Sequence, residues 1–228
     1  MDKCALEPEN MRVGSLFSHG HSLAWSYLTN LDWPWEALLL ISSYVRELGE
    51  KLDASKYEAR ANNVWIHKSA SIAPSAFIGE NVIIGADVEV RHCAFIRNDA
   101  IIGDFSIVGN STELKNVILF NEVQVPHFNY VGDSILGYKS HLGAGVITSN
   151  VKSDHSLVTV GCGEKRVETG LVKFGAVLGD YVEVGCNAVL NPGSVIGSHT
   201  TVYPLSMVRG FIPGGSIYKK QGEIAEKR

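Results

Sequence analysis

Three side chains of this sequence have the types and the spacing to do chemistry. Arg97 and Lys115 are 18 residues apart (115 − 97 = 18), and His127 follows Pro126. A guanidinium and an ammonium held side by side would bind a phosphate. An exposed histidine exchanges a proton near neutral pH more readily than other side chains. The same residues could also be solvated surface charges and an ordinary loop histidine, and Glu113 could pair with one of the cations.

A six-residue repeat of aliphatic residues must position these side chains. It runs through Ile66, Ile72, Ile78, Ile84, Val90, Ile96, Ile102, Val108 and Leu114, and again through Val172, Leu178, Val184, Leu190, Ile196, Val202 and Val208. Between the two runs, Val131, Leu136 and Leu142 keep the rhythm with one five-residue step. A period of six fits short strands separated by turns rather than a helix, and such repeats form β-helices.

Three hexapeptides in a coil would place residues 18 apart on neighbouring coils, about 4.8 Å from each other. Arg97 and Lys115 would then lie side by side. Pro126 occupies a repeat position and cannot donate a ladder hydrogen bond. We therefore expect the ladder to break there, so that His127 and Tyr130 project outward.

The repeat divides the chain into three parts. Residues 1–60 are predicted to be a helical segment and linker, with Asp32 capping a helix whose first turn holds Pro34. Residues 61–213 form the β-helix, interrupted at residues 150–173 by a protruding hairpin or loop that is either functional or a solvent-facing decoration. Residues 214–228 are expected to be a short tail or a frayed helix.

Composition excludes several classes of protein. The 228 residues are 45% hydrophobic, and the net charge of −4 is spread along the chain, which argues against a nucleic-acid binder. No apolar run is long enough to span a membrane. The four cysteines form no C-x-x-C pair, so a reducing cytoplasm is expected. The histidines are too widely spaced for a catalytic metal, and phosphate-loop and G-x-S-x-G motifs are absent.

The segment "STELKNVILFNEVQVPHFNYVGDSILGYKSHLGAGVITSN", residues 111–150, contains E-x-K, H-x-x-Y-x-G-D and G-A-G-x-I-T-x-N. It resembles the acetyltransferase β-helix of bifunctional sugar-1-phosphate acetyltransferase/nucleotidyltransferases, particularly the archaeal-type members, over residues 31–213. The resemblance implies an all-β fold, a left-handed parallel β-helix of hexapeptide repeats with an N-terminal helical segment. It also implies a homotrimer with its sites between subunits.

The resemblance implies a role for each matching residue. His127 would be the general base that takes a proton from a sugar amine, and Glu113 would orient it. The sugar phosphate would be held by Arg97 and Lys115, and the sugar by Tyr130, His141 and Asn150. The Ala144 N–H would stabilise the oxyanion, and acetyl-CoA, the co-substrate, would lie along Ala144, Cys186 and Pro204.

The sequence departs from the family at several points. It is expected to lack the nucleotidyltransferase domain. It has His141 where many bacterial relatives have Asn, and Cys186 where Ser is usual. The first hypothesis is acetyl-CoA-dependent N-acetylation of an amino-sugar phosphate such as glucosamine-1-phosphate. A second is acyl transfer to another amino sugar or sugar nucleotide. A third is a non-catalytic trimer that binds a sugar nucleotide.

Overall fold

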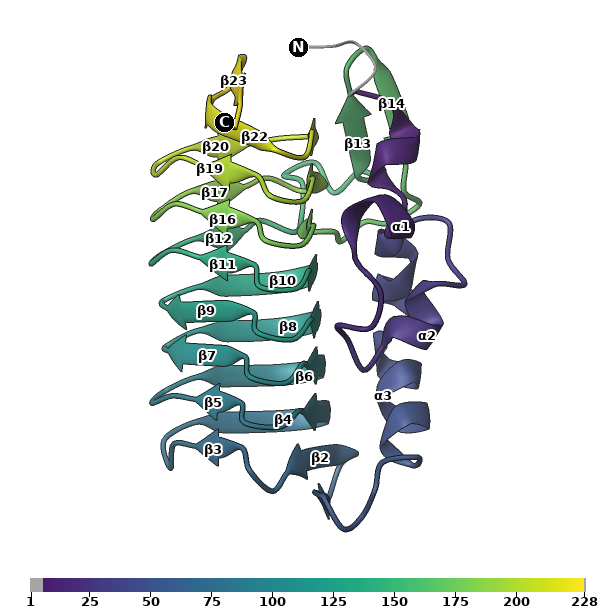
Figure 1. Ribbon diagram of the computed structural model, residues 1–228, viewed down its shortest axis with the longest axis vertical. Coiled ribbons are helices and arrows are strands. Elements are labelled where there is room, and N and C mark those ends of the chain that lie inside the picture. The colour runs from purple at the N-terminus through teal and green to yellow at the C-terminus, as the bar shows by residue number, and fades with distance from the viewer. Residues whose placement is uncertain (1–5, 228) are drawn as a thin grey trace.

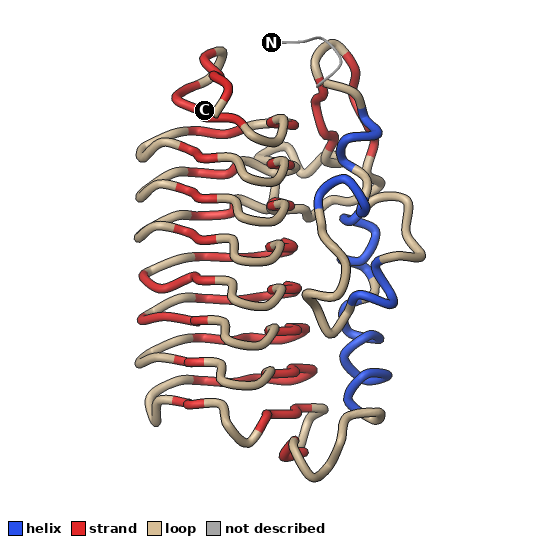
Figure 2. Tube along the Cα trace, in the orientation of Figure 1, coloured by secondary structure: helices blue, strands red, loops and turns tan. Residues whose placement is uncertain are grey.

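A stack of triangular coils forms the body of the protein, and short helices lie along one side of it (Figure 1). The computed structural model describes residues 6–227, so residues 1–5 with Cys4, and residue 228, lie outside the described part. Figure 2 shows that each coil consists of short strands joined by turns. The expected parallel β-helix is therefore present.

Two long sheets build the coils. The strands of the first are β1 (Tyr57–Arg60), β2 (Val64–His67), β4 (Phe77–Ile84), β6 (Phe95–Ile102), β8 (Glu113–Leu119), β10 (Tyr130–Leu136), β12 (Ile147–Thr148), β17 (Val189–Leu190) and β20 (Met207–Val208), with a branch of β15 (Ala176–Leu178), β18 (Ser194–Ile196) and β21 (Phe211–Ile212). The strands of the second are β3 (Ser71–Ile72), β5 (Glu89–Val90), β7 (Ile107–Asn110), β9 (Gln124–His127), β11 (His141–Leu142), β16 (Glu183–Val184), β19 (Thr201–Val202), β22 (Ser216–Lys220) and β23 (Glu223–Glu226).

The first sheet turns a corner inside its long strands and so supplies two faces of the prism. At this corner the backbone adopts positive φ at Asn81, Asp99, Asn116 and Asp133, a conformation that Asn and Asp tolerate better than most residues. Before the corner β10 pairs with β12, and after it with β15. The second sheet is the third face. Aliphatic side chains from all three faces fill the interior, and most of the predicted repeat residues are fully buried.

The coils become one residue shorter in the middle of the stack. Val82 pairs with Ala100, 18 residues on, but Ala100 pairs with Val117 and Val117 with Ser134, both 17 residues on. The missing residue falls between Leu114 and Leu119, which are both buried although only five residues apart. A second five-residue step separates the buried Val131 and Leu136, so the core positions are one residue earlier than a strict period of six predicts after Leu114 and two residues earlier after Val131.

This shift corrects the interpretation of Pro126. Val125 occupies the core position and pairs with Val108, and β9 continues through Pro126 to His127, which pairs with Asn110. The ladder does not break at Pro126. Proline lacks only the N–H donor, and its carbonyl still packs closely on Gly109. A Cβ at Gly109 would lie 1.6 Å from the Pro126 oxygen, so only glycine fits there.

The ends of the repeat also differ from expectation. Val172 is exposed, and the second run of core residues begins at Leu178. Residues 150–173 form a hairpin of β13 (Thr159–Cys162) and β14 (Lys165–Glu168). The C-terminal residues are not a tail or a helix, because β22 pairs with β19 and then with β23 in an antiparallel hairpin. The unpaired edge of the last coil recruits these residues, which have enough Ile and Tyr to form strands.

The N-terminal segment packs on the face that begins after the Asn/Asp corner. It contains the 3₁₀ helices η2 (Pro8–Met11) and η3 (Pro34–Leu39) and the α-helices α1 (Val13–Leu16), α2 (Trp25–Leu28) and α3 (Ile41–Gly49). The cap of η3 is Trp33 rather than Asp32, whose carboxylate pairs with Arg12 at 2.6 Å. Buried Asp180 accepts the Ser18 N–H at 2.7 Å and so ties this segment to the coils.

Candidate active site

One corner of the prism carries four of the predicted residues in a single column. The N–H that follows each column residue donates to the column residue one coil below. Gly145 donates to the oxygen of His127 at 3.0 Å, Asn187 to Ala144 at 2.9 Å, and Leu205 to Cys186 at 3.0 Å. The column therefore runs through Asn110, His127, Ala144, Cys186 and Pro204, about 4.8 Å apart where the coils are adjacent.

The corner holds His127 outward on a rigid base. His127 is exposed, and its N–H donates to the side chain of Asn129 at 3.1 Å. Asn129 is 2% exposed and donates in turn to the oxygen of Gly143 at 2.9 Å. Buried Asn129 thus fixes the backbone on both coils that carry His127 and Ala144. Within residues 6–227 the N–H of Ala144 donates no hydrogen bond to the protein, so it is available to a ligand.

A second group of predicted residues lies on the adjacent face, formed by β6, β8, β10 and β12. Arg97 and Lys115 follow the paired Ile96 and Leu114, so they lie on neighbouring coils as the repeat predicted. Arg97 Nη1 pairs with Glu113 Oε1 at 3.1 Å. Lys115 Nζ pairs with Asp133 at 2.9 and 3.1 Å. Each cation therefore has its own carboxylate, and the two do not form an unpaired cationic column.

Asp133 organises this group, and the sequence did not single it out. Its side chain is 3% exposed and accepts hydrogen bonds from Lys115, from Asn116 at 2.9 Å and from Asn150 at 2.5 Å. The only sequence signal for it is the D of H-x-x-Y-x-G-D. Because a buried carboxylate needs several donors, Asp133 explains why Lys115 and Asn150 converge.

Tyr130 joins the two pairs. Asn150 Nδ2 donates to the Tyr130 hydroxyl at 3.3 Å. The ring lies across Gly132, where a Cβ would be 2.5 Å from the hydroxyl oxygen. Burial raises the pKa of Tyr130, and the carboxylates of Asp133 and Glu113 raise it further. The phenol is therefore a neutral hydrogen-bonding group at neutral pH.

Glu113 does not contact His127 in the described structure. Its carboxylate instead pairs with Arg97, and its strand neighbour across β10 is Tyr130. The two residues lie on opposite sides of the corner, His127 at the end of β9 and Glu113 at the start of β8. Among the predicted residues, the structure thus brings together Arg97, Glu113, Lys115, Tyr130 and Asn150, with the His127 column beside them.

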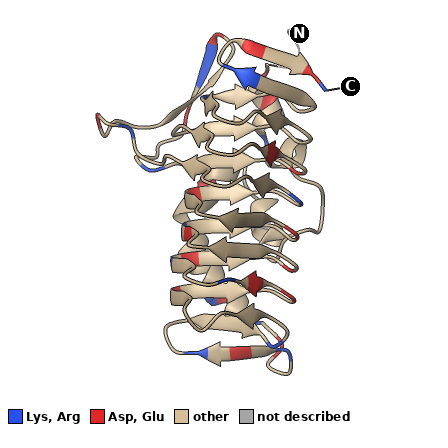
Figure 3. Ribbon diagram, turned by 90° about the vertical axis from the view of Figure 1, so that its left-hand side faces the viewer, with Lys and Arg blue, Asp and Glu red and all other residues tan. Residues whose placement is uncertain are grey.

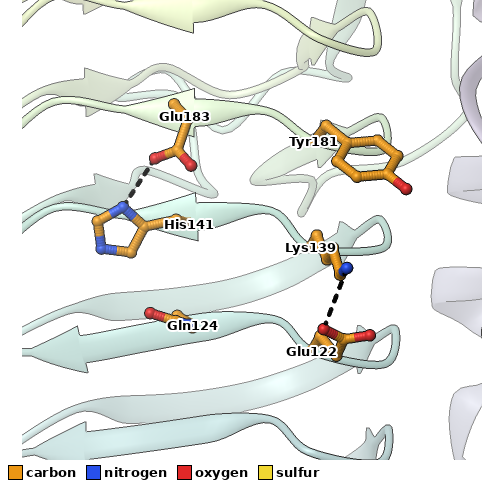
Figure 4. A pocket seen from close by; sticks show the side chains of 6 residues that line it. All are labelled: Glu122, Gln124, Lys139, His141, Tyr181 and Glu183. Atoms are coloured by element: carbon orange, nitrogen blue, oxygen red, sulfur yellow. Dashed lines mark hydrogen bonds and ion pairs between the residues drawn. The ribbon is translucent and has the colours of Figure 1, made fainter.

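His141 lies apart from this group, on the face of the second sheet. Its Nδ1 is 2.9 Å from Glu183 Oε2, and Glu122 pairs with Lys139 at 3.4 Å (Figure 4). These four residues, with Gln124 and Tyr181, line a shallow cavity of about 390 Å³. Within one chain, His141 and Tyr130 therefore do not meet.

A larger cavity of about 980 Å³ lies between the β13–β14 hairpin and the last coils. Lys152 and Arg166 line it, while Lys165 pairs with Glu7. Within residues 6–227, no group of three or more His, Cys, Asp or Glu side chains is placed to hold a metal ion. No helix in the same part of the chain is long and apolar enough to cross a membrane.

Charged residues gather at the edges of the coils, and the faces between them are largely uncharged (Figure 3). His127 lies at one corner of the prism, and the buried Asp133 carboxylate lies at the next. The arrangement offers a proton acceptor, a free backbone donor and a fixed network of polar groups within one stretch of four coils.

Curated proteins similar to this chain include several that are named as bifunctional. The bifunctional protein GlmU of Methanococcus maripaludis is 32% identical over 214 residues, which cover 92% of this chain and 51% of that protein. GlmU of Methanococcus vannielii is 38% identical over 120 residues, 52% of this chain and 29% of that protein. The bifunctional sugar-1-phosphate nucleotidylyltransferase/acetyltransferase of Sulfurisphaera tokodaii is 33% identical over 109 residues, 48% of this chain and 27% of that protein. The chain spans about half or less of the length of these relatives.

Solved structures with a similar chain trace are more distant. A putative acetyltransferase from Desulfovibrio desulfuricans is 18% identical, with a TM-score of 0.39, over 80% of this chain and 30% of that one. The acetyltransferase domain of PglB from Neisseria gonorrhoeae, in complex with acetyl coenzyme A, is also 18% identical, with a TM-score of 0.31, over 68% of this chain and 53% of that one.

The family described as the GMPPB C-terminal domain matches residues 88–204. The matched region begins at β5 and ends at Pro204, so it contains the whole His127 column and the Asp133 network. It covers just over half of the 228 residues. This chain therefore belongs to the family of the GMPPB C-terminal domain.

Proposed function

We propose that the protein is an acetyl-CoA-dependent N-acetyltransferase whose acceptor is an amino-sugar phosphate, such as glucosamine-1-phosphate. The observation that carries the proposal is the column in which exposed His127 lies one coil below the free N–H of Ala144. That pairing supplies a base and an oxyanion donor at one corner, as acyl transfer requires. The name of the Sulfurisphaera tokodaii relative, which includes acetyltransferase, supports the same class of reaction.

The residues of the corner would divide the reaction between them. Acetyl-CoA supplies the acetyl group as a thioester. His127 takes the proton from the sugar amine as the new C–N bond forms, and the Ala144 N–H donates to the oxyanion. The C–S bond then breaks, and the CoA thiolate takes up the proton that His127 removed, which returns His127 to its starting form. Cys186 and Pro204, on the next coils, would border the path of the CoA arm.

The polar network would position the acceptor. Arg97 uses Nη1 for Glu113, so its other N–H groups remain for a phosphate. Lys115 is held by both oxygens of Asp133 and contributes less. Tyr130 and Asn150 would hydrogen-bond the sugar hydroxyls. Glu113 would act on Arg97 rather than on His127. His141 would face the acceptor only if a second copy of the chain places the sheet that carries its His141 against this corner.

A thiol-release assay with acetyl-CoA and a panel of amino sugars and amino-sugar phosphates tests the proposal. We expect turnover of glucosamine-1-phosphate that His127→Ala abolishes. His92→Ala is the matched control, because His92 is exposed in the same column two coils below and lies outside the proposed site. Equal activity in His127→Ala would remove His127 as the base, and no turnover with any acceptor would favour the binding hypothesis.

The proposed mechanism transfers the acetyl group directly to the amine, without an acetyl-enzyme. Cys186 is exposed in the column and is the residue that an alternative mechanism would use. We expect Cys186→Ser to retain turnover. Mass spectrometry that trapped an acetylated Cys186, competent to pass its acetyl group to the acceptor, would contradict direct transfer.

A second acceptor class is favoured by one observation. The His141–Glu183 pair replaces the Asn that the resemblance implies at this position, so the face that carries it offers a different set of donors and acceptors. Another amino sugar or a sugar nucleotide would then be the acceptor. Faster turnover of such an acceptor than of glucosamine-1-phosphate in the same assay would establish this alternative.

A further inference from the structure

The groove between the β13–β14 hairpin and the last coils is built by close backbone packing. The hairpin buries Val158, Val160 and Cys162, which are at most 1% exposed. It rests on Gly193 and Gly210, the same corner of successive coils. A Cβ at Gly210 would lie 2.7 Å from the oxygen of Gly161, and one at Gly193 would lie 2.7 Å from Val158. Both glycines have positive φ, so the hairpin has a defined seat on the coils.

This packing brings two arginines from distant parts of the chain into one groove. Arg166 is the strand partner of Gly161, and its Nη1 lies 3.9 Å from the position a Gly161 Cβ would take. Arg209 directly precedes Gly210, which packs on that same Gly161. Both arginines line the cavity of about 980 Å³. The close approach of two glycines is therefore what places the two guanidinium groups on one ligand-sized space.

The groove is positively charged, and its arginines are not neutralised. Within the described residues, the side chains of Arg166 and Arg209 make no hydrogen bond or ion pair, whereas those of Arg60, Arg91 and Arg97 each pair with a glutamate. Lys152 adds a third cation, and the acidic Asp154 that also lines the groove lies 4.0 Å from it. An excess of positive charge stands out in a chain whose net charge is −4. Two like charges in one groove favour an anion between them.

We propose that this groove binds a phosphate-bearing ligand of nucleotide size, with Arg166 and Arg209 on a diphosphate group. The volume lies within the range of small-molecule sites, and planar guanidinium groups match phosphate oxygens. Uncharged side chains such as Asn191 and Gln221 also line the groove and can meet a base or a sugar. The groove lies at a different corner of the prism from the His127 column, and the two corners are separated by β17 and β20. Neither Arg97 nor Lys115 lines the groove.

Two molecules carry the required chemistry, the 3′-phospho-ADP end of CoA and a nucleoside-diphosphate sugar. Isothermal titration of the full chain with CoA, 3′-dephospho-CoA, uridine diphosphate and inorganic diphosphate distinguishes them. Binding of CoA alone assigns the groove to CoA, and that outcome rests on the proposed function. Binding of uridine diphosphate assigns it to a nucleoside diphosphate. Binding of inorganic diphosphate with equal affinity assigns it to the diphosphate itself.

Arg166→Ala and Arg209→Ala test the two contacts. Each should raise the Kd of the bound probe by about tenfold, because each removes a charged hydrogen-bond donor. Both side chains are exposed, so the variants should fold. Arg60→Ala, a paired arginine at the other end of the stack, is the matched control and should leave the Kd unchanged. Uridine diphosphate and inorganic diphosphate lack the thiol-bearing arm of CoA, so their binding is measured separately from the proposed catalytic corner.

Two results would overturn the proposal. One is the absence of binding by all four probes at millimolar concentration. The other is a Kd that neither arginine substitution changes while the probe still binds, since the ligand would then occupy another part of the surface.

Discussion

At the scale of single residues, the carboxylate of Asp133 determines how the candidate site is arranged. It accepts hydrogen bonds from Lys115, Asn116 and Asn150 while almost completely buried. A charge in that position is stable only if its donors stay in place. The network therefore gives Lys115 and Asn150 fixed positions before any ligand binds.

Removing Lys115 should cost stability. In Lys115→Ala, Asp133 keeps only its amide donors, so the free energy of unfolding should fall by about 1–3 kcal/mol. The control is Arg60→Ala, because the exposed pair of Arg60 with Glu58 is screened by water and should contribute little to stability. Urea denaturation of both variants gives the comparison. Equal losses would mean that the Asp133 network is no stronger than a surface ion pair.

Tyrosine ionisation should weaken the fold at alkaline pH. Burial raises the pKa of Tyr57 to about 12, with a smaller contribution from Asp104. An unfolded tyrosine ionises near pH 10, so between pH 10 and 12 the unfolded chain has lost a proton that the folded chain retains. Stability is therefore full below pH 10 and falls as the pH rises towards 12. Tyr57→Phe should make this fall shallower in urea titrations at pH 9, 10 and 11, and an unchanged slope would contradict the argument.

Glu183 should fix the tautomer of His141. With Nδ1 donating to Glu183, neutral His141 presents Nε2 as an acceptor. Nitrogen NMR should show the Nδ1–H form in the wild type and a mixture in Glu183→Gln. If His141 faces the acceptor sugar, the same substitution should raise the acceptor KM several-fold with little change in kcat. A single Nδ1–H form in Glu183→Gln would show that the carboxylate has no such role.

At the scale of elements, β9 shows how the repeat tolerates a proline. Gly109 on β7 faces Pro126 on β9, and the absence of a side chain lets the proline carbonyl approach the backbone. The exposed His127 comes directly after this contact. The geometry of the corner therefore depends on a glycine one coil below it.

Gly109→Ala should disrupt this pair of strands. The new Cβ would lie 1.6 Å from the Pro126 oxygen, and backbone cannot move aside as a flexible side chain can. We expect a loss of about 3 kcal/mol or more in the free energy of unfolding. Gly14→Ala is the control, because nothing lies within 4 Å of its Cβ and Ala favours a helix over Gly. Denaturant midpoints of the two variants should move in opposite directions, and a neutral Gly109→Ala would contradict the packing argument.

At the scale of the whole molecule, an apolar stripe runs along the stack beside the candidate site. Seven residues on successive coils pair with one another in register along the first sheet, and two of them are Glu113 and Tyr130. The other five members of this column are large apolar residues, between 37% and 58% exposed: Phe77, Phe95, Ile147, Val189 and Met207. A stripe of this kind is typical of a surface that another protein covers.

The homotrimer expected from the sequence would use this stripe. A closed ring forms when the stripe of each copy contacts another surface of the neighbouring copy. Such a contact would bring a second copy against the candidate site. Light scattering should give about three times the chain mass of 24.8 kDa. Phe95→Asp should shift the protein towards the monomer and lower turnover, while Leu39→Asp, which alters an exposed leucine on the helical side, should do neither. A monomeric wild type would overturn the expectation.

Much of the fold follows from local sequence rules. The six-residue period by itself separated core residues such as Ile96 and Leu114 from outward residues such as Arg97 and Lys115, and it placed those two cations on neighbouring coils. A chain of short strands, each with one inward aliphatic side chain, has few ways to bury those side chains other than stacking in coils, because the outward side chains must remain in contact with water. The exposed position of His127 also followed from the sequence, although the reason given for it was wrong.

Only the tertiary structure decided which groups meet. The cations are paired because Asp133 and Glu113 reach them across coils, and a one-residue slip before Leu119 moved every later position in the register. The seat of the hairpin on Gly210, the strands at the C-terminus and the separation of His141 from Tyr130 also depend on contacts between residues far apart in the chain. A repeat determines which side of a strand a residue faces. The residue that it contacts on the next coil depends on the exact length of that coil, and the loss of a single residue from a coil changes this length.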